Sequence, residues 1–288
     1  MGTRLLAGVP YAAIPGSRPL ELDLYLPADA AKPAPVVVFL HGGGWRLGSR
    51  HSLGLAYADA APTPFQRLAQ GGLAVASADY RLSGEARWPA QLHDAKAAVR
   101  WLRARASELG IDQARVAAWG ESAGGHLAAL LGLTGTESDG EVGVLGPSSA
   151  VGAVVAWYAP SDLTAVATDL GADPMAADAR EALLLGEPVP AVPELAAEAS
   201  PVSQVRPEAP PFLLLHGRDD RLIPCAQSER LAVRLRRTGV PVELETYPGA
   251  GHMWLGTPQT AERALDRTID FLQRQLHPTA SGVSKPVK

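Results

Sequence analysis

The chain has 288 residues, of which 47% are hydrophobic and 19% are charged, and its formal charge at pH 7 is −4. This composition can fill a large core, which excludes intrinsic disorder. Because the balance is acidic and the arginines are scattered, we expect no nucleic-acid partner. The single cysteine, Cys225, excludes an internal disulfide and a thiolate zinc site, and it favours the reducing cytoplasm.

Two segments bear on targeting and membrane insertion. Residues 1–10 contain too few apolar side chains for a signal-peptide core. Residues 142–161 carry no charged side chain and are long enough to span a bilayer. The Gly-Pro-Ser-Ser turn at 146–149 divides that stretch, so we expect no membrane span.

Short apolar runs alternate with longer helical patterns, which predicts an α/β fold with a mostly parallel sheet and helices on both faces. Segments 20–26 and 242–247 alternate with period two and are expected near opposite edges of the sheet. Nearly continuous apolar runs predict buried strands at 36–40, 73–77, 115–119, 151–157 and 212–215. Apolar residues three and four positions apart predict helices at 89–109, from about 125 onward, at 224–238 and at 261–276.

No shift in composition divides the chain, so we expect one domain over residues 1–277 and a flexible C-terminal tail over 278–288. Two long irregular stretches remain, 48–64 and 168–210. Loops of this size are often functional, so both are candidates for the walls of a substrate cleft.

The strongest chemical signal is the sequence Gly-Glu-Ser-Ala-Gly-Gly at 120–125, between a predicted strand and a predicted helix. This is the context of a nucleophile elbow, in which small flanking residues let strand and helix pack closely around an exposed serine hydroxyl. We therefore predict Ser122 as the nucleophile, with a glycine-rich turn as the alternative. A serine hydroxyl is a weak nucleophile, so the motif also predicts a base and an acid further along the chain.

The sequence His-Gly-Gly-Gly-Trp at 41–45 follows the predicted strand 36–40. Consecutive glycines let backbone N–H groups converge on one point, as the oxyanion of acyl transfer requires. The predicted donors are Gly43, Gly44 and Ala123. The alternatives are a plain turn or a phosphate-binding loop, but the patterns typical of phosphate loops are absent from this segment.

Seven histidines compete for the role of base. We predict His252, because it lies in a loop of small residues between the last strand and the last helix, where α/β enzymes present catalytic side chains. Five of the other six histidines have less suitable positions: His93 and His126 fall in helical patterns, His41 is expected to brace the glycine turn, His51 lies in a loop, and His277 ends the last helix.

The acid must lie on a loop beside the base, where it fixes the tautomer and stabilises the imidazolium. Asp219 and Asp220 both follow the buried strand 212–215, and Asp162 follows the strand ending at 157. The chain order of serine, acid and histidine is the one typical of α/β-hydrolases.

Taken together, the motifs resemble those of serine esterases of the α/β-hydrolase superfamily, in the His-Gly-Gly-Gly carboxylesterase and lipase group and its feruloyl and acetyl esterase-like branch. The resemblance covers about residues 20–275 and rests on five segments: 41–45, 79–82, 120–125, 216–224 and 251–252. It implies an α/β-hydrolase fold without a separate cap domain, and it implies Asp220 as the acid. It also implies that Asp79-Tyr80-Arg81-Leu82 is a structural turn braced by charge pairs. Relative to this branch, residues 52–63 are enlarged.

The pocket itself is predicted from tryptophans near the motif loops. Trp45 and Trp254 are expected to line an apolar acyl or aryl pocket. Trp157 fits either the pocket or the core, whereas Trp88, Trp101 and Trp119 are expected in the core.

The predicted function is serine-dependent hydrolysis of short-chain acyl or aryl carboxylic esters through an acyl-enzyme, without a metal or organic cofactor. The expected partner is a small-molecule ester, and a homodimer is compatible with the sequence. The first alternative is an amide hydrolase, such as a formamidase or peptidase, with the same residues. The second is a non-catalytic hydrolase-like binding protein, which typically lacks one of the three side chains.

Overall fold

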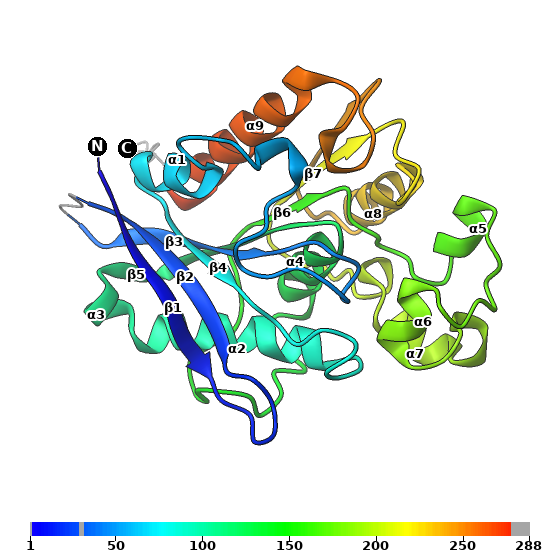
Figure 1. The fold of residues 1–288 in the computed structure, drawn as a ribbon, viewed down its shortest axis with the longest axis horizontal. Helices are drawn as coiled ribbons and strands as arrows, with labels where there is room; N and C mark the ends of the chain where they lie inside the picture. Colours follow the sequence, from blue (N-terminus) through cyan, green and yellow to red (C-terminus); the bar gives the residue numbers. More distant parts are fainter. Residues whose placement is uncertain (1, 29–31, 278–288) are drawn as a thin grey trace, which may run out of the picture.

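The computed structural model describes residues 2–28 and 32–277; the tail predicted at 278–288 lies outside these residues. The described residues form one eight-stranded sheet with the order β1-β2-β4-β3-β5-β6-β7-β8 (Figure 1). Strands β1 and β2 are antiparallel to their neighbours, and the others run parallel. The strands are β1 (Thr3–Ala12), β2 (Leu20–Pro27), β3 (Ala34–Leu40), β4 (Ala74–Ala78), β5 (Ile111–Glu121), β6 (Val154–Trp157), β7 (Phe212–Gly217) and β8 (Val242–Tyr247).

Helices cover both faces of this sheet, as the alternation of elements predicted. The helices α1 and α9 lie on one side and α2 lies on the other (Figure 1). The helices are α1 (Pro64–Gln70), α2 (Ala90–Ala104), α3 (Ala106–Leu109), α4 (Ala123–Thr134), α5 (Val166–Leu170), α6 (Arg180–Leu185), α7 (Pro193–Glu198), α8 (Ala226–Arg237) and α9 (Pro258–Leu276).

The continuous apolar runs of the central strands have a direct physical cause. In β7, Phe212 and Leu214 pack into the core beneath α2, α4 and α8, while Leu213 and Leu215 pack into the core beneath α1 and α9. Both faces of the strand are therefore removed from water, so every position favours an apolar side chain.

The N-terminal strand β1 was not predicted, and it is this strand, rather than β2, that forms one edge of the sheet. The pairing of β1 with β2 shifts register between Leu6 and Val9, where Gly8 has a φ of 62°. This bulge breaks the period-two pattern by which a strand is recognised in a sequence. The opposite edge is β8, as predicted.

Several predicted boundaries also differ from the structure. The helix predicted at 89–109 is divided at Arg105 into α2 and α3, although Gly110 ends it in the left-handed conformation as expected. The strand predicted at 151–157 is confined to β6. The stretch 168–210 is more regular than predicted, because it contains α6, α7 and most of α5.

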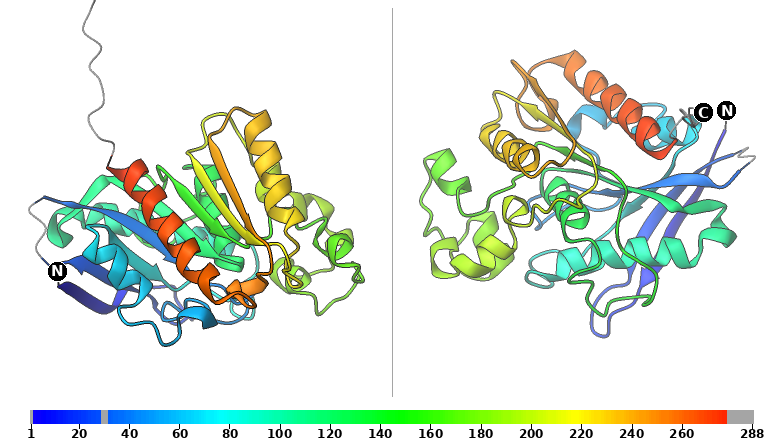
Figure 2. Two further views of the ribbon diagram at one scale, coloured as in Figure 1. Left: turned by 90° about the horizontal axis from the view of Figure 1, so that it is seen from above. Right: turned by 180° about the vertical axis from the view of Figure 1, so that it is seen from behind.

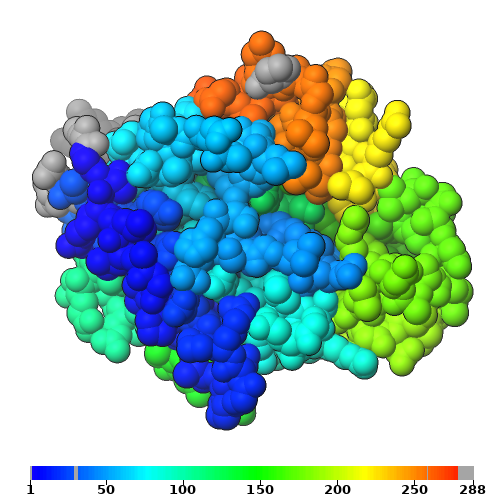
Figure 3. Space-filling model, in the orientation of Figure 1, coloured from blue at the N-terminus to red at the C-terminus, as the bar shows by residue number. Residues whose placement is uncertain are grey.

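The helices α5, α6 and α7 form a lobe at one side of the sheet (Figure 2). On the molecular surface this green lobe stands beside the blue segment that follows β3 (Figure 3). Arg180 at the start of α6 reaches the loop of residues 41–50 after β3, called the glycine loop below, since a Cβ atom added at Gly44 would lie 2.7 Å from the Arg180 Cδ atom. The lobe therefore contacts the loop that carries the predicted oxyanion donors.

Among the described residues, no helix combines the length and the apolar character that crossing a membrane requires.

We expect Leu214→Ala to lower the free energy of unfolding by about 3 kcal/mol, because Leu214 is fully buried in the central strand β7 and truncation leaves a cavity. Urea unfolding followed by circular dichroism measures this loss. The control is Leu145→Ala, at a side chain that is 60% exposed, where we expect a change within about 0.5 kcal/mol. Equal losses in both variants would contradict the assignment of Leu214 to the core.

Candidate active site

Ser122 lies on a strained turn between β5 and α4. Its φ of 51° and ψ of −119° lie in a region that side chains rarely adopt. The turn is held by the N–H of Ser122, which donates to Trp157 O at 2.8 Å, and by the N–H of His126, which donates to Ser122 O at 3.0 Å. This geometry is that of a nucleophile elbow.

The glycines around Ser122 are required by close backbone approaches. A Cβ atom on Gly120 would lie 2.2 Å from Gly124 O, and one on Gly124 would lie 2.0 Å from Leu40 O. Any side chain at these positions would push α4 away from the sheet. The sequence motif is therefore a packing requirement as well as a turn signal.

The structure brings Ser122, His252 and Asp220 into one hydrogen-bonded chain. His252 Nε2 lies 3.0 Å from Ser122 Oγ, and His252 Nδ1 lies 2.6 Å from Asp220 Oδ2. The two other candidate acids lie elsewhere: Asp219 is exposed, and Asp162 pairs with Arg230 at 3.6 Å. Of the three aspartates, Asp220 has the geometry to orient the imidazole.

Asp220 remains ionised despite its burial. Burial alone would raise its pKa, but hydrogen bonds from His216 and His252 and from the backbone N–H of Ile223 lower the pKa well below its usual range. Its Oδ1 atom accepts the N–H groups of Leu222 and Ile223 at 2.8 and 2.9 Å. A fixed negative charge therefore lies against Nδ1 of His252, where it favours the Nδ1–H tautomer and leaves Nε2 free to accept a proton.

The loop after β3 places Gly43 and Gly44 beside this chain. Their φ values are 113° and 61°, in the left-handed region, and a Cβ atom on Gly43 would lie 2.2 Å from Leu47 O. Only glycine fits this path without strain. Gly43, Gly44 and Ala123 all line the cavity that contains Ser122, as the prediction of oxyanion donors requires.

The glycine loop is anchored at its start and middle by the turn after β4. Tyr80 donates its hydroxyl to His41 O at 2.9 Å and stacks on the His41 ring at 4.3 Å. The N–H of Ser83 donates to Trp45 O at 2.7 Å. His41 Nδ1 donates to Gly42 O at 2.7 Å, which is the brace that the sequence predicted. Burial lowers the pKa of His41 to about 4, so its ring is neutral.

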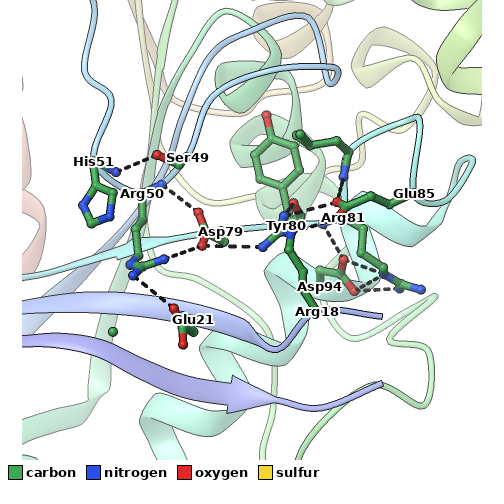
Figure 4. Close-up of polar contacts among 12 residues, drawn as sticks. Arg18, Glu21, Ser49, Arg50, His51, Asp79, Tyr80, Arg81, Glu85 and Asp94 are labelled. Carbon is green, nitrogen blue, oxygen red and sulfur yellow. Dashed lines mark hydrogen bonds and ion pairs between the residues drawn. The ribbon is translucent and has the colours of Figure 1, made fainter. Parts of the chain in front are cut away.

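Arg50 anchors the end of the same loop (Figure 4). Its guanidinium contacts three carboxylates: Glu21 at 3.0 Å, Asp23 at 2.9 Å and Asp79 at 2.7 Å. Its backbone N–H donates to Asp79 Oδ1 at 2.7 Å, and its carbonyl accepts the Ser77 hydroxyl. Main chain and side chain at position 50 are therefore both fixed to β2 and β4.

The cavity over Ser122 has a volume of about 230 Å³ and is lined mostly by apolar surface, with Arg180 and Glu181 from α6 in its wall. The predicted stretch 168–210 thus contributes to the wall. Burial raises the pKa of Glu181. Trp45 also lines the cavity, although its ring is almost fully buried and its Nε1 donates to His126 Nδ1 at 3.3 Å.

The structure corrects the prediction for Trp254. Its ring packs in the core against Trp157, Tyr158 and Tyr247, with centroids 4.7–5.5 Å apart, and it is absent from the described lining of the Ser122 cavity. The cause is the conformation after His252: Met253 and Trp254 both have positive φ, which turns the chain so that Met253 lines the cavity instead. Trp157 is likewise a core residue.

The remaining histidines are engaged elsewhere. His126 is buried with Nε2 on Ala199 O at 2.7 Å, and burial lowers its pKa to about 4. His51 pairs with Asp23 at 3.1 Å, and His277 lies 3.2 Å from Arg115. His93 is half-buried.

Sequence reasoning missed Glu121 as a part of the site. Its carboxylate is buried beside Ser122, where it accepts the Tyr158 hydroxyl at 2.6 Å and the N–H of Gly54 at 3.1 Å. Burial raises its pKa, against the effect of these hydrogen bonds. The Tyr158 ring packs on His252 at 4.6 Å. The sequence did contain a signal for Glu121: it is the only charged residue at the apolar end of β5, and it directly precedes Ser122.

Within residues 2–28 and 32–277, no group of three or more His, Cys, Asp or Glu side chains is arranged as a metal site.

Comparison with known proteins identifies the family. The family model described as BD-FAE matches residues 22–235. Esterase LipC of Mycobacterium tuberculosis (strain ATCC 25618 / H37Rv) is 36% identical over 278 residues, which cover 94% of this chain and 66% of LipC. The chain belongs to the BD-FAE family. This BD-FAE chain spans 58–66% of the length of the mycobacterial relatives that match most of it.

Solved structures agree with the α/β-hydrolase fold of this BD-FAE chain. A truncated form of a carbohydrate esterase from gut microbiota superposes with a TM-score of 0.83 at 28% identity, covering 95% of this chain and 96% of that one. Esterase Est2 of the planctomycete Thermogutta terrifontis superposes with a TM-score of 0.76 at 27% identity, covering 97% and 95%. Est2 has also been solved phosphorylated by paraoxon.

We expect Arg50→Met to loosen the glycine loop of this BD-FAE chain, because it leaves three carboxylates without their shared cation while keeping an apolar stem. The expected loss of stability is about 3 kcal/mol, and backbone amides over residues 41–50 should exchange hydrogen for deuterium faster, as read by mass spectrometry. The control is Arg67→Met, which removes ion pairs to the exposed Glu262 and Asp266. Equal exchange over 41–50 in both variants would refute the anchoring role.

Proposed function

We propose that this chain is a serine carboxylic ester hydrolase that acts on short-chain acyl or aryl esters through an acyl-enzyme. The observation that carries the proposal is the hydrogen-bonded chain from Ser122 Oγ through His252 to Asp220, which ends in a cavity lined by Gly43, Gly44 and Ala123. These are the nucleophile, base, acid and oxyanion donors that acyl transfer requires.

In the first half-reaction, Ser122 Oγ attacks the ester carbonyl carbon while His252 Nε2 takes the hydroxyl proton. The carbonyl oxygen becomes an oxyanion, which the N–H groups of Gly43, Gly44 and Ala123 stabilise. Each such donor typically contributes about 3–4 kcal/mol to transition-state binding. The charge of Asp220 stabilises the imidazolium that forms.

The intermediate then collapses. The C–O bond to the alcohol breaks, and His252 returns its proton to the leaving oxygen. In the second half-reaction a water molecule attacks the acyl-enzyme while His252 again takes the proton. The bond between the acyl carbon and Ser122 Oγ then breaks, His252 returns the proton to Oγ, and the acid product leaves. The protons and electron pairs balance without a cofactor.

The size of the cavity supports small substrates at the reacting carbon. A volume of about 230 Å³ lined mainly by apolar side chains suits a short acyl or an aryl group. The amide alternative would use the same atoms, but the relatives reported above are named esterases, which favours the ester.

The proposal extends to the domain organisation, the partner, the location and the oligomeric state of the protein. We propose a single domain over residues 1–277 and a small-molecule ester as partner. We also propose a location in the reducing cytoplasm, which is supported by the presence of a single cysteine, Cys225. A homodimer stays a prediction that analytical ultracentrifugation tests.

Ser122→Ala should lower kcat on p-nitrophenyl acetate by at least about 10⁴-fold, because the nucleophile is lost. Paraoxon should add its phosphoryl group to the wild-type protein at Ser122, as located by peptide mass spectrometry, and should leave the variant unlabelled. Ser107→Ala, at an exposed serine of α3, is the control and should keep full activity. Retained hydrolysis in Ser122→Ala would refute the assignment.

Asp220→Asn should lower kcat by about 10³–10⁴-fold with little change in KM, because the amide no longer enforces the tautomer of His252 or stabilises its cation. The matched control is Asp219→Asn, one residue away and exposed, which should keep kcat within about twofold. If Asp219→Asn were the variant that lost activity, the acid would be misassigned.

A further inference from the structure

A second cavity adjoins the one over Ser122. Its volume is about 490 Å³, against about 230 Å³ for the first. Gly42, Gly43, Leu47, Glu121 and Met253 line both cavities. One wall, made by the glycine loop and by the residue after His252, is therefore common to the two spaces.

Most of the second cavity is built by the stretch 48–64, which was predicted as a candidate cleft wall. Its inner surface includes Leu53, Tyr57 and Phe65, which are buried, and its mouth includes Leu47 and Leu55, which are 69% and 66% exposed. Large apolar side chains that are exposed to solvent around a concave surface are typical of a site that binds an apolar group.

The charged groups that line this cavity are already paired. Both carboxylate oxygens of Glu121 accept hydrogen bonds, from Gly54 and from Tyr158. His51 pairs with Asp23 at 3.1 Å. A ligand in this cavity thus meets apolar and aromatic surface rather than a free charge.

Gly54 keeps the space near the common wall open. A Cβ atom there would lie 3.1 Å from Glu121 Oε2 and 4.0 Å from the Cβ atom of Met253, two residues that line both cavities. Its φ of 45° also disfavours any other residue.

We propose that the second cavity is a substrate subsite that takes a bulky apolar or aromatic substituent of the ester while the carbonyl reacts at Ser122. The proposal rests on the proposed ester hydrolase function. It assigns the stretch 48–64 the role of selecting esters with one large apolar side, which the small Ser122 cavity alone does not accommodate.

The test fills the cavity at a position outside the catalytic machinery. Ala58 lines the second cavity only and is exposed in an unstrained conformation. In Ala58→Phe, kcat/KM for bulky esters should fall at least tenfold, whereas kcat/KM for ethyl acetate, which has no large substituent on either side of the carbonyl, should stay within twofold. The control is Ala56→Phe, an exposed position of the same segment that is absent from the described lining.

Two substrate series locate the substituent. In one, p-nitrophenyl esters carry acetyl, cyclohexanecarbonyl or 3-phenylpropanoyl groups; in the other, acetates carry phenyl, naphthyl or biphenyl groups. If Ala58→Phe lowers kcat/KM only for the bulky esters of the first series, the acyl group lies in the cavity. If it lowers kcat/KM only for the bulky esters of the second series, the alcohol lies there. Leu55→Ala is a second variant that should fold, since Leu55 is largely exposed. It should also lower kcat/KM for the bulky esters while leaving kcat/KM for the small esters unchanged.

An unchanged ratio of bulky to small esters in both Ala58→Phe and Leu55→Ala would overturn the subsite, even with a fully active enzyme. A wild-type protein that hydrolyses no ester of either series and resists paraoxon would instead overturn the proposed function. The two failures are therefore distinguishable.

Discussion

The site depends on one close contact between backbones, in which the first turn of α4 lies against the end of β3. A Cβ atom at Gly124 would lie 2.0 Å from Leu40 O and 2.4 Å from His41 O. Ser122 immediately precedes this turn and the glycine loop immediately follows β3. The contact therefore fixes the distance between the nucleophile and the N–H groups of the loop. Catalysis by preorganised donors needs such fixed geometry, because a misplacement of about 1 Å costs much of the rate.

The parts of the fold that local chemistry dictates could be predicted from the sequence. Central strands buried on both faces need continuous apolar runs, and the elbow needs glycine at 120 and 124, so both left clear signals. The strand β1 left none, because the bulge at Gly8 shifts its side chains between faces. Trp254 was misplaced for a related reason: two consecutive residues with positive φ reverse the expected direction of its side chain.

Long-range polar contacts were beyond sequence reasoning. The alternation of 20–26 predicted a strand near the edge of the sheet, where polar side chains face water, yet Asp23 is 3% exposed. It is buried because Arg50 and the N–H of Gly8 both bond its carboxylate, and neither partner is near it in the sequence. Asp219 and Asp220 are likewise equivalent in their local chemistry. Only the family resemblance favoured Asp220, which the fold places 2.6 Å from His252. The residues that flank a charged side chain in the sequence do not indicate which distant residue it will pair with.

Arg50 divides the segment between β3 and α1 into two parts with different roles. Up to Arg50 the chain is held by Tyr80, Ser83 and Asp79, all from the turn after β4. Beyond Arg50 it supplies most of the residues that line the second cavity. Because the ion pairs at Arg50 tie the chain to β2 and β4, we expect changes in 51–64 to alter the shape of that cavity while the proposed oxyanion donors, Gly43 and Gly44, stay in place. Consecutive stretches of the same loop thus contribute the proposed oxyanion donors and most of the lining of the second cavity.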